Sequence, residues 1–191
     1  MEAILTQQIT VSEFRDMYFN EDENANLYEL MEGEIIRRGG VAILHQRISR
    51  KLILTLSGFV DTEKLGEIFY APVDIILDKH NLFQPDLVFV GNHQKEIITP
   101  GFINGSPDLV VEIISPGSVM RDRIQKKQVY ERTGVKEYWL VSPEYAEIEI
   151  FILVNGKYQL HSAATAEEGK LESIILKEMQ LDLKALFAIN S

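Results

Sequence analysis

The apolar positions of this chain follow two kinds of pattern, one with helical spacing and one typical of strands. Between residues 45 and 62 they recur every three or four positions, which predicts a long helix. A second long helix is expected at 118–133, where Gly134 would end it. Shorter helices are expected at 12–17 and 181–187. The chain therefore has at least two helices long enough to cover a sheet.

Short β-rich runs separate these helices. The runs at 27–31 and 34–38 flank Glu32-Gly33 and predict a hairpin. A second hairpin is expected around Asn155-Gly156. The run at 108–114 is almost continuously apolar, as in a strand that is covered on both faces. The remaining strands are expected at 66–70, 73–77, 86–90 and 137–141.

This order of elements predicts an α/β or α+β layered fold, in which helices flank a mixed central sheet. The chain has 191 residues, 46% of them hydrophobic and 25% charged, which is the balance of an ordinary globular protein. Neither a linker rich in Pro, Gly and Ser nor an internal repeat divides the sequence. We therefore expect one domain over residues 1–191.

The composition excludes several classes of site and location. The absence of cysteine excludes disulfides, a cysteine nucleophile and thiolate-bound zinc or iron–sulfur centres. No apolar run approaches the roughly 20 residues that cross a bilayer, and the N-terminus does not resemble a signal peptide. We expect a cytoplasmic protein without a membrane contact.

The net charge of −10 argues against a non-specific grip on phosphate backbones. A local basic face is still compatible with it, because basic residues gather in two groups. Groups of this size are usually solvated surface, and they contact phosphates only if they flank a cleft. Their members are Arg37, Arg38, Arg47, Arg50 and Lys51 in one group, and Arg121 and Arg123 in the other.

Two carboxylates occur at positions where burial of a charged group is energetically unfavourable. Asp86 follows Pro85 at the start of one predicted strand, and Glu112 lies near the end of the apolar run at 108–114. A buried charge is disfavoured unless it has a partner. If adjacent strands bring the two carboxylates together, a cation between them would relieve their repulsion. Oxygen ligands of this kind suit Mg²⁺ or Mn²⁺ better than zinc.

The second long helix supplies a positive charge. Asp122, Lys126 and Tyr130 recur at four-residue spacing, so they share one face of the helix. If that face lies over the sheet, Lys126 can approach the carboxylates and orient a water that attacks a phosphodiester. The alternative is that Lys126 is a solvated lysine on an amphipathic helix. Similarly, Asp86 alone can be a residue that only begins a strand.

Several of these segments together resemble a known family. They are Tyr28-Glu29-Leu30 with Gly33-Glu34, His45, Pro85-Asp86, the run from Pro107 to Pro116, Asp122 with Lys126 and Tyr130, and Gly134 to Trp139. In this order, over about residues 12–153, the chain resembles the Uma-two family of restriction-endonuclease-like proteins, which belongs to the PD-(D/E)XK nuclease superfamily. The resemblance implies a restriction-endonuclease-like mixed central sheet, with the N-terminal and C-terminal hairpins as its extensions.

The resemblance also implies roles for individual residues. Asp86 and Glu112 would be the motif acids that bind Mg²⁺, or Mn²⁺, together with the backbone carbonyl of Ile113. The usual motif has a lysine two residues after the second acid, where this chain has Ile114. The lysine would therefore be Lys126 on the following helix, rather than its neighbour Lys127. Glu29, His45, Asp122 and Tyr130 are candidates to line the cleft. A structural role is the alternative for Glu29 and His45, and for Tyr130 we favour core packing that also holds the helix to the sheet.

The leading hypothesis is a metal-dependent endonuclease, a hydrolase that cuts DNA phosphodiester bonds and acts as a homodimer by analogy with the superfamily. Two other classes compete with it. One is a catalytically silent nuclease fold that binds nucleic acid or a protein partner, which the displaced lysine and the acidic charge would suit. The other is a dimeric structural or regulatory protein whose acidic surface meets a basic protein.

Overall fold

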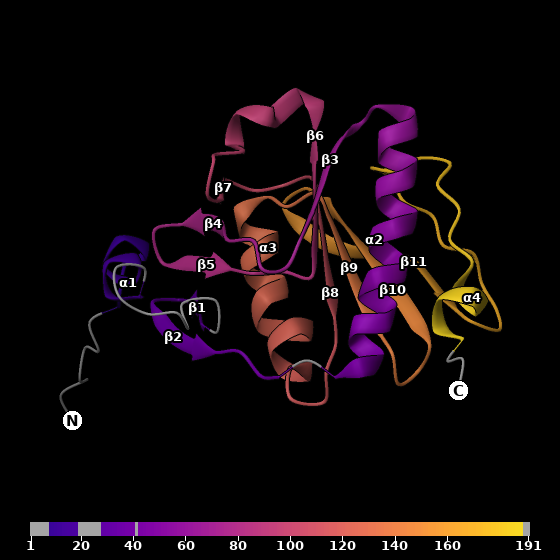
Figure 1. Ribbon diagram of the computed structural model, residues 1–191, viewed down its shortest axis with the longest axis horizontal. Helices are drawn as coiled ribbons and strands as arrows, with labels where there is room; N and C mark the ends of the chain where they lie inside the picture. Colours follow the sequence, from indigo (N-terminus) through magenta and orange to yellow (C-terminus); the bar gives the residue numbers. More distant parts are fainter. Residues whose placement is uncertain (1–7, 19–27, 41, 189–191) are drawn as a thin grey trace.

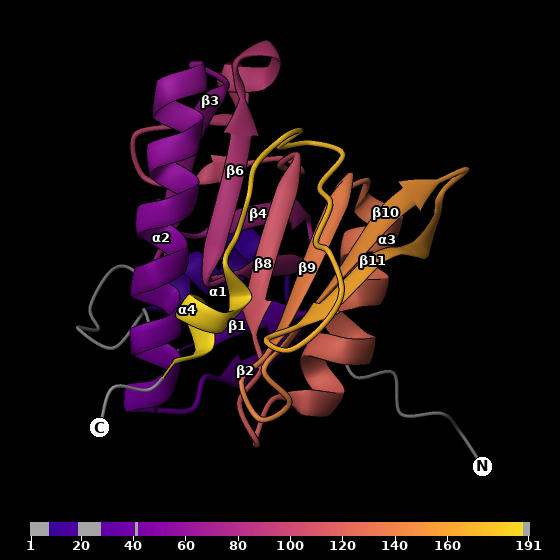
Figure 2. The same ribbon diagram turned by 90° about the vertical axis from the view of Figure 1, so that its right-hand side faces the viewer.

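A six-stranded mixed sheet forms the centre of the fold (Figures 1 and 2). The structure is a computed structural model that describes residues 8–18, 28–40 and 42–188. The strand order is β11-β10-β9-β8-β6-β3, in which β8 and β9 pair in parallel and the other neighbours pair antiparallel. These strands are β3 (Gly66–Tyr70), β6 (Leu87–Gly91), β8 (Leu109–Ile113), β9 (Glu137–Ser142), β10 (Glu147–Val154) and β11 (Lys157–Thr165).

A second, five-stranded sheet has the order β2-β1-β5-β4-β7. It contains the N-terminal hairpin, which we expected to extend the central sheet, so that expectation is corrected. The hairpin instead pairs with β5, where Leu30 lies opposite Leu82, and both side chains pack with Phe14 in a small separate core. The C-terminal hairpin does extend the central sheet, as expected. The strands of the second sheet are β1 (Tyr28–Met31), β2 (Glu34–Arg37), β4 (Ile75–Asp78), β5 (Asn81–Phe83) and β7 (Ile103–Asn104).

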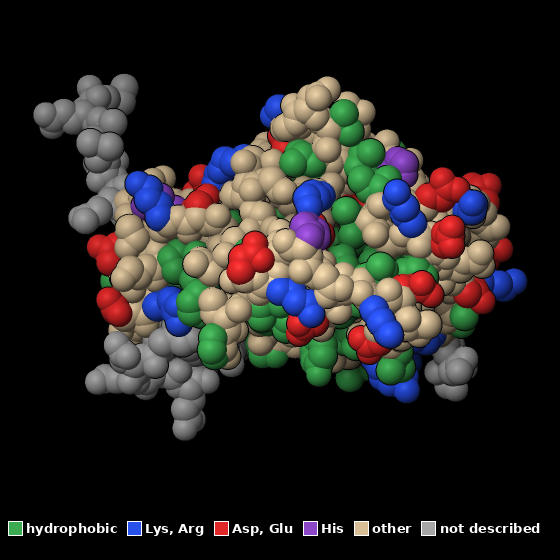
Figure 3. All heavy atoms as spheres, turned by 90° about the horizontal axis from the view of Figure 1, so that it is seen from above, with side chains coloured by type: hydrophobic (Ala, Val, Ile, Leu, Met, Phe, Trp, Pro, Cys, Tyr) green, Lys and Arg blue, Asp and Glu red, His purple; other side chains and the backbone are tan. Residues whose placement is uncertain are grey.

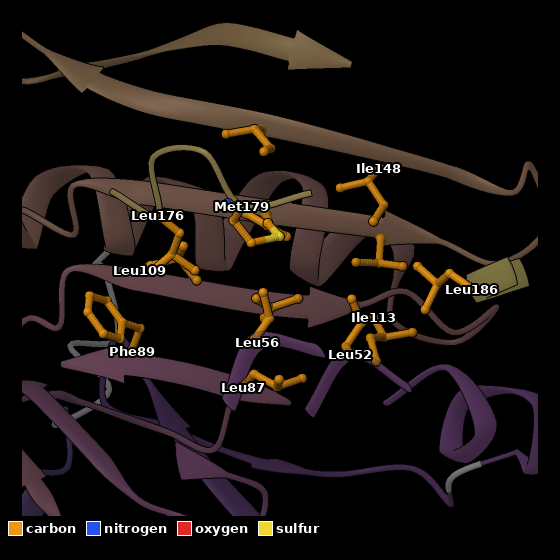
Figure 4. Close-up of a cluster of buried hydrophobic side chains, with 14 of the residues drawn as sticks. Leu52, Leu56, Leu87, Phe89, Leu109, Ile113, Ile148, Leu176, Met179 and Leu186 are labelled. Carbon is orange, nitrogen blue, oxygen red and sulfur yellow. The ribbon is translucent and has the colours of Figure 1, made fainter. Parts of the chain in front are cut away.

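Helices cover both faces of the central sheet (Figure 2). On one face α2 and α4 bury a large apolar cluster, part of which Figure 4 shows. On the other face α3 packs on the sheet together with residues of the second sheet. The bounds are α1 (Val11–Tyr18), α2 (Ile43–Glu63), η2 (Asn92–Ile97), η3 (Arg121–Lys126), α3 (Lys127–Thr133) and α4 (Leu183–Phe187). No helix in the described part of the chain is long and apolar enough to cross a bilayer.

The strand β8 shows how the central sheet places a polar group. Because side chains alternate along a strand, Leu109, Val111 and Ile113 face α2, whereas Val110 faces α3. Glu112 takes the next position on the α3 side and is buried there. A carboxylate therefore stands where the packing pattern calls for an apolar side chain.

The helix expected at 118–133 contains a π-helical stretch in its first half. Residues Arg121–Lys126 form η3, which continues directly into α3, and Gly134 ends the helix in the left-handed conformation as expected. Helical spacing did not predict the wider π turn, which inserts an extra residue and often occurs at functional sites. Asp122, Lys126 and Tyr130 are nevertheless all buried, so the predicted common face is confirmed.

Candidate functional site

Asp86 directly precedes β6, and Glu112 lies in β8, the antiparallel neighbour of β6. The register of β6 and β8 sets Leu87 opposite Val111. Continuing it by one residue sets Asp86 opposite Glu112, on the face that looks toward α3. Both residues are buried, with 6% and 4% of their surface exposed. The sheet thus brings the two carboxylates together in the way that the sequence predicted.

Each carboxylate oxygen of Asp86 has one hydrogen-bond partner, and the two partners come from different elements. Its Oδ2 accepts a hydrogen bond of 2.7 Å from the backbone N–H of Ile113, the residue after Glu112. Its Oδ1 lies 3.0 Å from Nε2 of His45, in the first turn of α2. His45 therefore reaches the site, in agreement with its predicted place in the cleft.

Lys126 lies between two carboxylates. Its Nζ donates to Oε1 of Glu29 at 2.8 Å and to Oε1 of Glu112 at 2.9 Å. The Tyr130 hydroxyl donates to the same Glu112 oxygen at 2.7 Å. The lysine on the helix therefore reaches the second motif acid although it is far from the usual position in sequence. Lys127 points elsewhere, with its Nζ 3.3 Å from the centre of the Phe151 ring.

The charges of this cluster are strongly coupled. Burial raises the pKa of Glu112 to about 8, and the nearby carboxyls of Asp122, Asp86 and Glu29 add to this effect, while Lys126 opposes it. Burial alone would lower the pKa of Lys126, but the attraction of Glu112 and Glu29 outweighs it, so the pKa is raised and the ammonium stays charged. The site therefore has more carboxyl groups than its one buried lysine can neutralise.

A pocket of about 380 Å³ opens onto this cluster. It is called the catalytic pocket below, after the role expected from the sequence for these residues. Arginines lie at its margin, which places part of both basic groups beside the cleft. Lys51 and Arg123 do not contribute, because Lys51 caps the end of α4 through the carbonyls of residues 185, 186 and 188, and Arg123 pairs with Glu149. The lining includes His45, Asp86, Glu112, Ile113, Asp122, Lys126, Arg37, Arg38 and Arg121.

Two of the candidate cleft residues lie behind the catalytic pocket instead of lining it. Glu29 and Tyr130 are both fully buried. Glu29 extends from β1, which is a buried strand of the second sheet and not an extension of the central sheet. The expectation that Glu29 lines the cleft is therefore corrected for the same reason as the expected place of the N-terminal hairpin. Tyr130 sits one turn beyond Lys126, under the helix. Glu29 accepts a hydrogen bond from Lys126 and Tyr130 donates one to Glu112, both on the buried side of the Lys126–Glu112 pair. Neither side chain can touch a ligand in the pocket.

The residues of the catalytic pocket fit a hard divalent cation. In the described part of the chain, no three His, Asp or Glu side chains are arranged to hold a metal by themselves. Mg²⁺ does not need three, because it keeps several waters and binds proteins through one or two carboxylates. Asp86 and Glu112 supply these two carboxylates beside the Ile113 backbone. Burial and the neighbouring carboxyls raise the pKa of Glu112, and a bound cation would favour its ionised form.

Sequence reasoning missed a polar network beneath the site. Gln84 donates from its backbone N–H to Glu29 and from its side chain to Asp74, and its side-chain oxygen accepts from Arg38. This network ties the second sheet to the segment that leads through Asp86 into β6. Its only signal in the sequence is a glutamine directly before Pro85, which is too weak to predict burial.

Asp108, which follows a proline as Asp86 does, serves another part of the fold. Its carboxylate accepts hydrogen bonds from the Gly91 backbone N–H and from the side chains of Gln94 and Lys136. It does not line the catalytic pocket. Asp108 therefore has a structural role, at the position just before β8.

Comparisons with known proteins point in one direction. The chain is 22% identical over 179 residues to the uncharacterized protein sll1609 of Synechocystis sp., covering 93% of this chain and 99% of that protein. Its fold matches a crystal structure from Anabaena variabilis described as "a putative nuclease belonging to DUF820", with a TM-score of 0.76 and 18% identity over 94% of this chain and 97% of that one. The model of the Uma2 family, described as "Putative restriction endonuclease", matches residues 11–184. This match spans most of the sequence, and the chain belongs to the Uma2 family.

Proposed function

We propose that this protein is a Mg²⁺-dependent endonuclease that hydrolyses DNA phosphodiester bonds, with Mn²⁺ as an alternative metal. One observation carries the proposal. The ammonium of Lys126 is hydrogen-bonded to Glu112 in a pocket that Asp86 also lines. Two acids and a lysine thus meet in space, although the lysine is not where the usual motif has it. The family and the fold support a nuclease independently of this geometry.

The two motif acids would hold the metal, with the Ile113 backbone carbonyl as a third oxygen ligand. When bound, the divalent cation would stabilise the negative charge that develops on the phosphate. The backbone N–H of Ile113 and the ring of His45 fix the orientation of the Asp86 carboxylate. Because His45 and Asp86 come from α2 and the start of β6, the packing of α2 on the sheet sets the geometry of the site.

Lys126 would orient the attacking water as a hydrogen-bond donor. Two of its three N–H groups donate to Glu29 and Glu112, and the third has no hydrogen-bond acceptor in the described part of the chain. That group can donate to a water in the catalytic pocket, which Lys126 lines. Since its raised pKa keeps Lys126 charged, the lysine holds the water and does not remove its proton.

The assembly and setting that we propose follow from the superfamily and the substrate. A homodimer would give two catalytic pockets, one for each strand of a DNA duplex. We expect the enzyme to act in the cytoplasm, where it would meet its DNA substrate. Sedimentation of the purified protein tests the dimer directly.

The experiment that tests the function is cleavage of plasmid and single-stranded DNA by the purified protein with Mg²⁺ or Mn²⁺. An Asp86→Asn protein, purified in parallel, is the control for contaminating nuclease. We expect cleavage by the wild type alone, and only with the metal. Equal cleavage by both proteins would identify a contaminant, and no cleavage by either would favour the catalytically silent alternative.

Metal binding should also be visible without catalysis. At about ten times its dissociation constant, a cation bound only to the folded protein adds roughly 1.4 kcal/mol of stability. For a chain of this length we therefore expect Mg²⁺ or Mn²⁺ to raise Tm by about 3–6 °C. The shift should vanish in Asp86→Asn, whose side chain can still pair with Ile113 and His45. A full shift in Asp86→Asn, measured by thermal denaturation, would remove Asp86 from the metal site.

A further inference from the structure

A second pocket adjoins the catalytic pocket on the other side of Asp86. It measures about 390 Å³ and shares Arg38, His45 and Asp86 with the catalytic pocket. The two pockets therefore adjoin at the proposed metal ligand Asp86, and together they are called the groove below. A strand whose phosphate lies at Asp86 would enter the second pocket with its neighbouring nucleotide.

One wall of the second pocket is a face of α2. Gln46, Ser49, Arg50 and Ile53 line it at helical spacing, beside the stripe that the helix buries in the core. These side chains offer hydrogen-bonding groups and a cation without any carboxylate. Such a wall suits a polar, negatively charged ligand.

The opposite wall is the corner that follows β3. Tyr70, Ala71 and Pro72 line the pocket here, and the Ala71 backbone N–H donates to the carbonyl of Asp86 at 3.2 Å. This hydrogen bond fixes the corner beside the catalytic carboxylate. Tyr70 is 57% exposed, so its ring is accessible to a ligand in the pocket. An exposed aromatic ring next to arginines is the combination on which unpaired bases stack.

The charge distribution favours a local contact. The protein has a net charge of −10, and on the face in Figure 3 Lys and Arg side chains are interspersed with Asp and Glu and form no broad basic surface. In the second pocket positive charge is in excess, since two arginines, Arg38 and Arg50, line it together with one carboxylate, that of Asp86. A nucleic acid strand would thus be attracted to this groove and not to the general surface.

We propose that the second pocket is a nucleotide subsite, in which the base next to the scissile phosphate stacks on Tyr70 and its phosphate lies between Arg38 and Arg50. The inference rests on the proposed nuclease function and adds a substrate class, because a stacked base must be unpaired: the ligand is single-stranded DNA.

The test is binding of a labelled single-stranded oligothymidylate, followed by fluorescence anisotropy in EDTA so that no cleavage is needed. We expect Tyr70→Ala to weaken binding about tenfold, the usual effect of losing one stacked base, and Tyr70→Phe to bind as the wild type. Tyr145→Ala is the matched control, because Tyr145 is 66% exposed and lines neither pocket. A duplex of the same sequence should respond less to Tyr70→Ala.

Two results would overturn the subsite. One is Tyr70→Ala that binds as tightly as Tyr145→Ala, and the other is a wild type that does not bind the oligonucleotide. The subsite and the proposed function can fail separately. Binding that depends on Tyr70 without any metal-dependent cleavage would keep the subsite and reject the nuclease. Cleavage that does not depend on Tyr70 would keep the nuclease and reject the subsite.

Discussion

Glu112→Gln is expected to abolish DNA cleavage without destabilising the fold. Replacing a group that only supports a metal ligand lowers activity by about 10- to 100-fold, so loss of a ligand itself should exceed about 100-fold. The glutamine oxygen can still accept the hydrogen bonds of Lys126 and Tyr130. The substitution therefore removes the negative charge toward the metal and keeps the packing. Cleavage assays and urea unfolding of the same preparations measure the two effects.

The stability of Glu112→Gln should depend on pH in a defined direction. The folded-state pKa of Glu112 is about 8, above its ordinary value of 4.5. Below pH 4.5 the carboxyl is protonated in both the folded and the unfolded state and does not change the free energy of unfolding. Between pH 4.5 and 8 the carboxyl ionises only in the unfolded chain, which favours unfolding. Without metal, the free energy of unfolding of the variant should therefore rise relative to that of the wild type as the pH goes from 5 to 8, by on the order of a few kcal/mol.

Glu137 provides the matched control, since it is also a fully buried glutamate on the central sheet. Its carboxylate accepts from the Trp139 ring, the Ser173 hydroxyl and the backbone N–H groups of Ile174 and Ile175. Glutamine cannot accept on both sides, so Glu137→Gln should lower stability. If Glu112→Gln loses stability at every pH in the same way, Glu112 is a structural partner and not a metal ligand.

The parts of the site that could be predicted are those that depend on local pattern. A carboxylate inside an apolar strand stands out at Glu112, and the four-residue spacing places Lys126 on the buried face of its helix. Both inferences need only the alternation of a strand or the period of a helix. They hold even though the helix contains a π-helical stretch, because the stretch lies within a continuous helix whose buried face is kept.

The parts that could not be predicted depend on contacts between distant segments. Glu29 looked like a residue at the cleft, but its strand pairs with β5, a strand of three residues that shows no period. That pairing joins positions about fifty residues apart, and it turns Glu29 into the buried partner of Lys126. In the same way, the second pocket arises where α2 meets the corner after β3, and neither segment suggests it alone.

Lys126→Met is expected to abolish cleavage and also to destabilise the protein. Glu29 is fully buried, and although burial by itself raises its pKa, the charges of Lys126 and Arg38 outweigh this and lower it, so the side chain is ionised. Removing one partner of a buried ion pair leaves an uncompensated charge, at a cost of about 3–5 kcal/mol. Lys127→Met is the control, because Lys127 packs on Phe151 outside the catalytic pocket, and it should keep its cleavage activity.

A double variant separates the two effects of Lys126. Adding Glu29→Gln removes the charge that Lys126→Met leaves unpaired, so the double variant should recover most of the lost stability, as measured by urea unfolding. Cleavage should stay absent, because no ammonium remains to hold the attacking water. Recovery of cleavage along with stability would mean that Lys126 acts only by holding the fold together. If Lys127→Met loses cleavage and Lys126→Met keeps it, the assignment of Lys126 is wrong. The proposed position of the attacking water is then wrong as well.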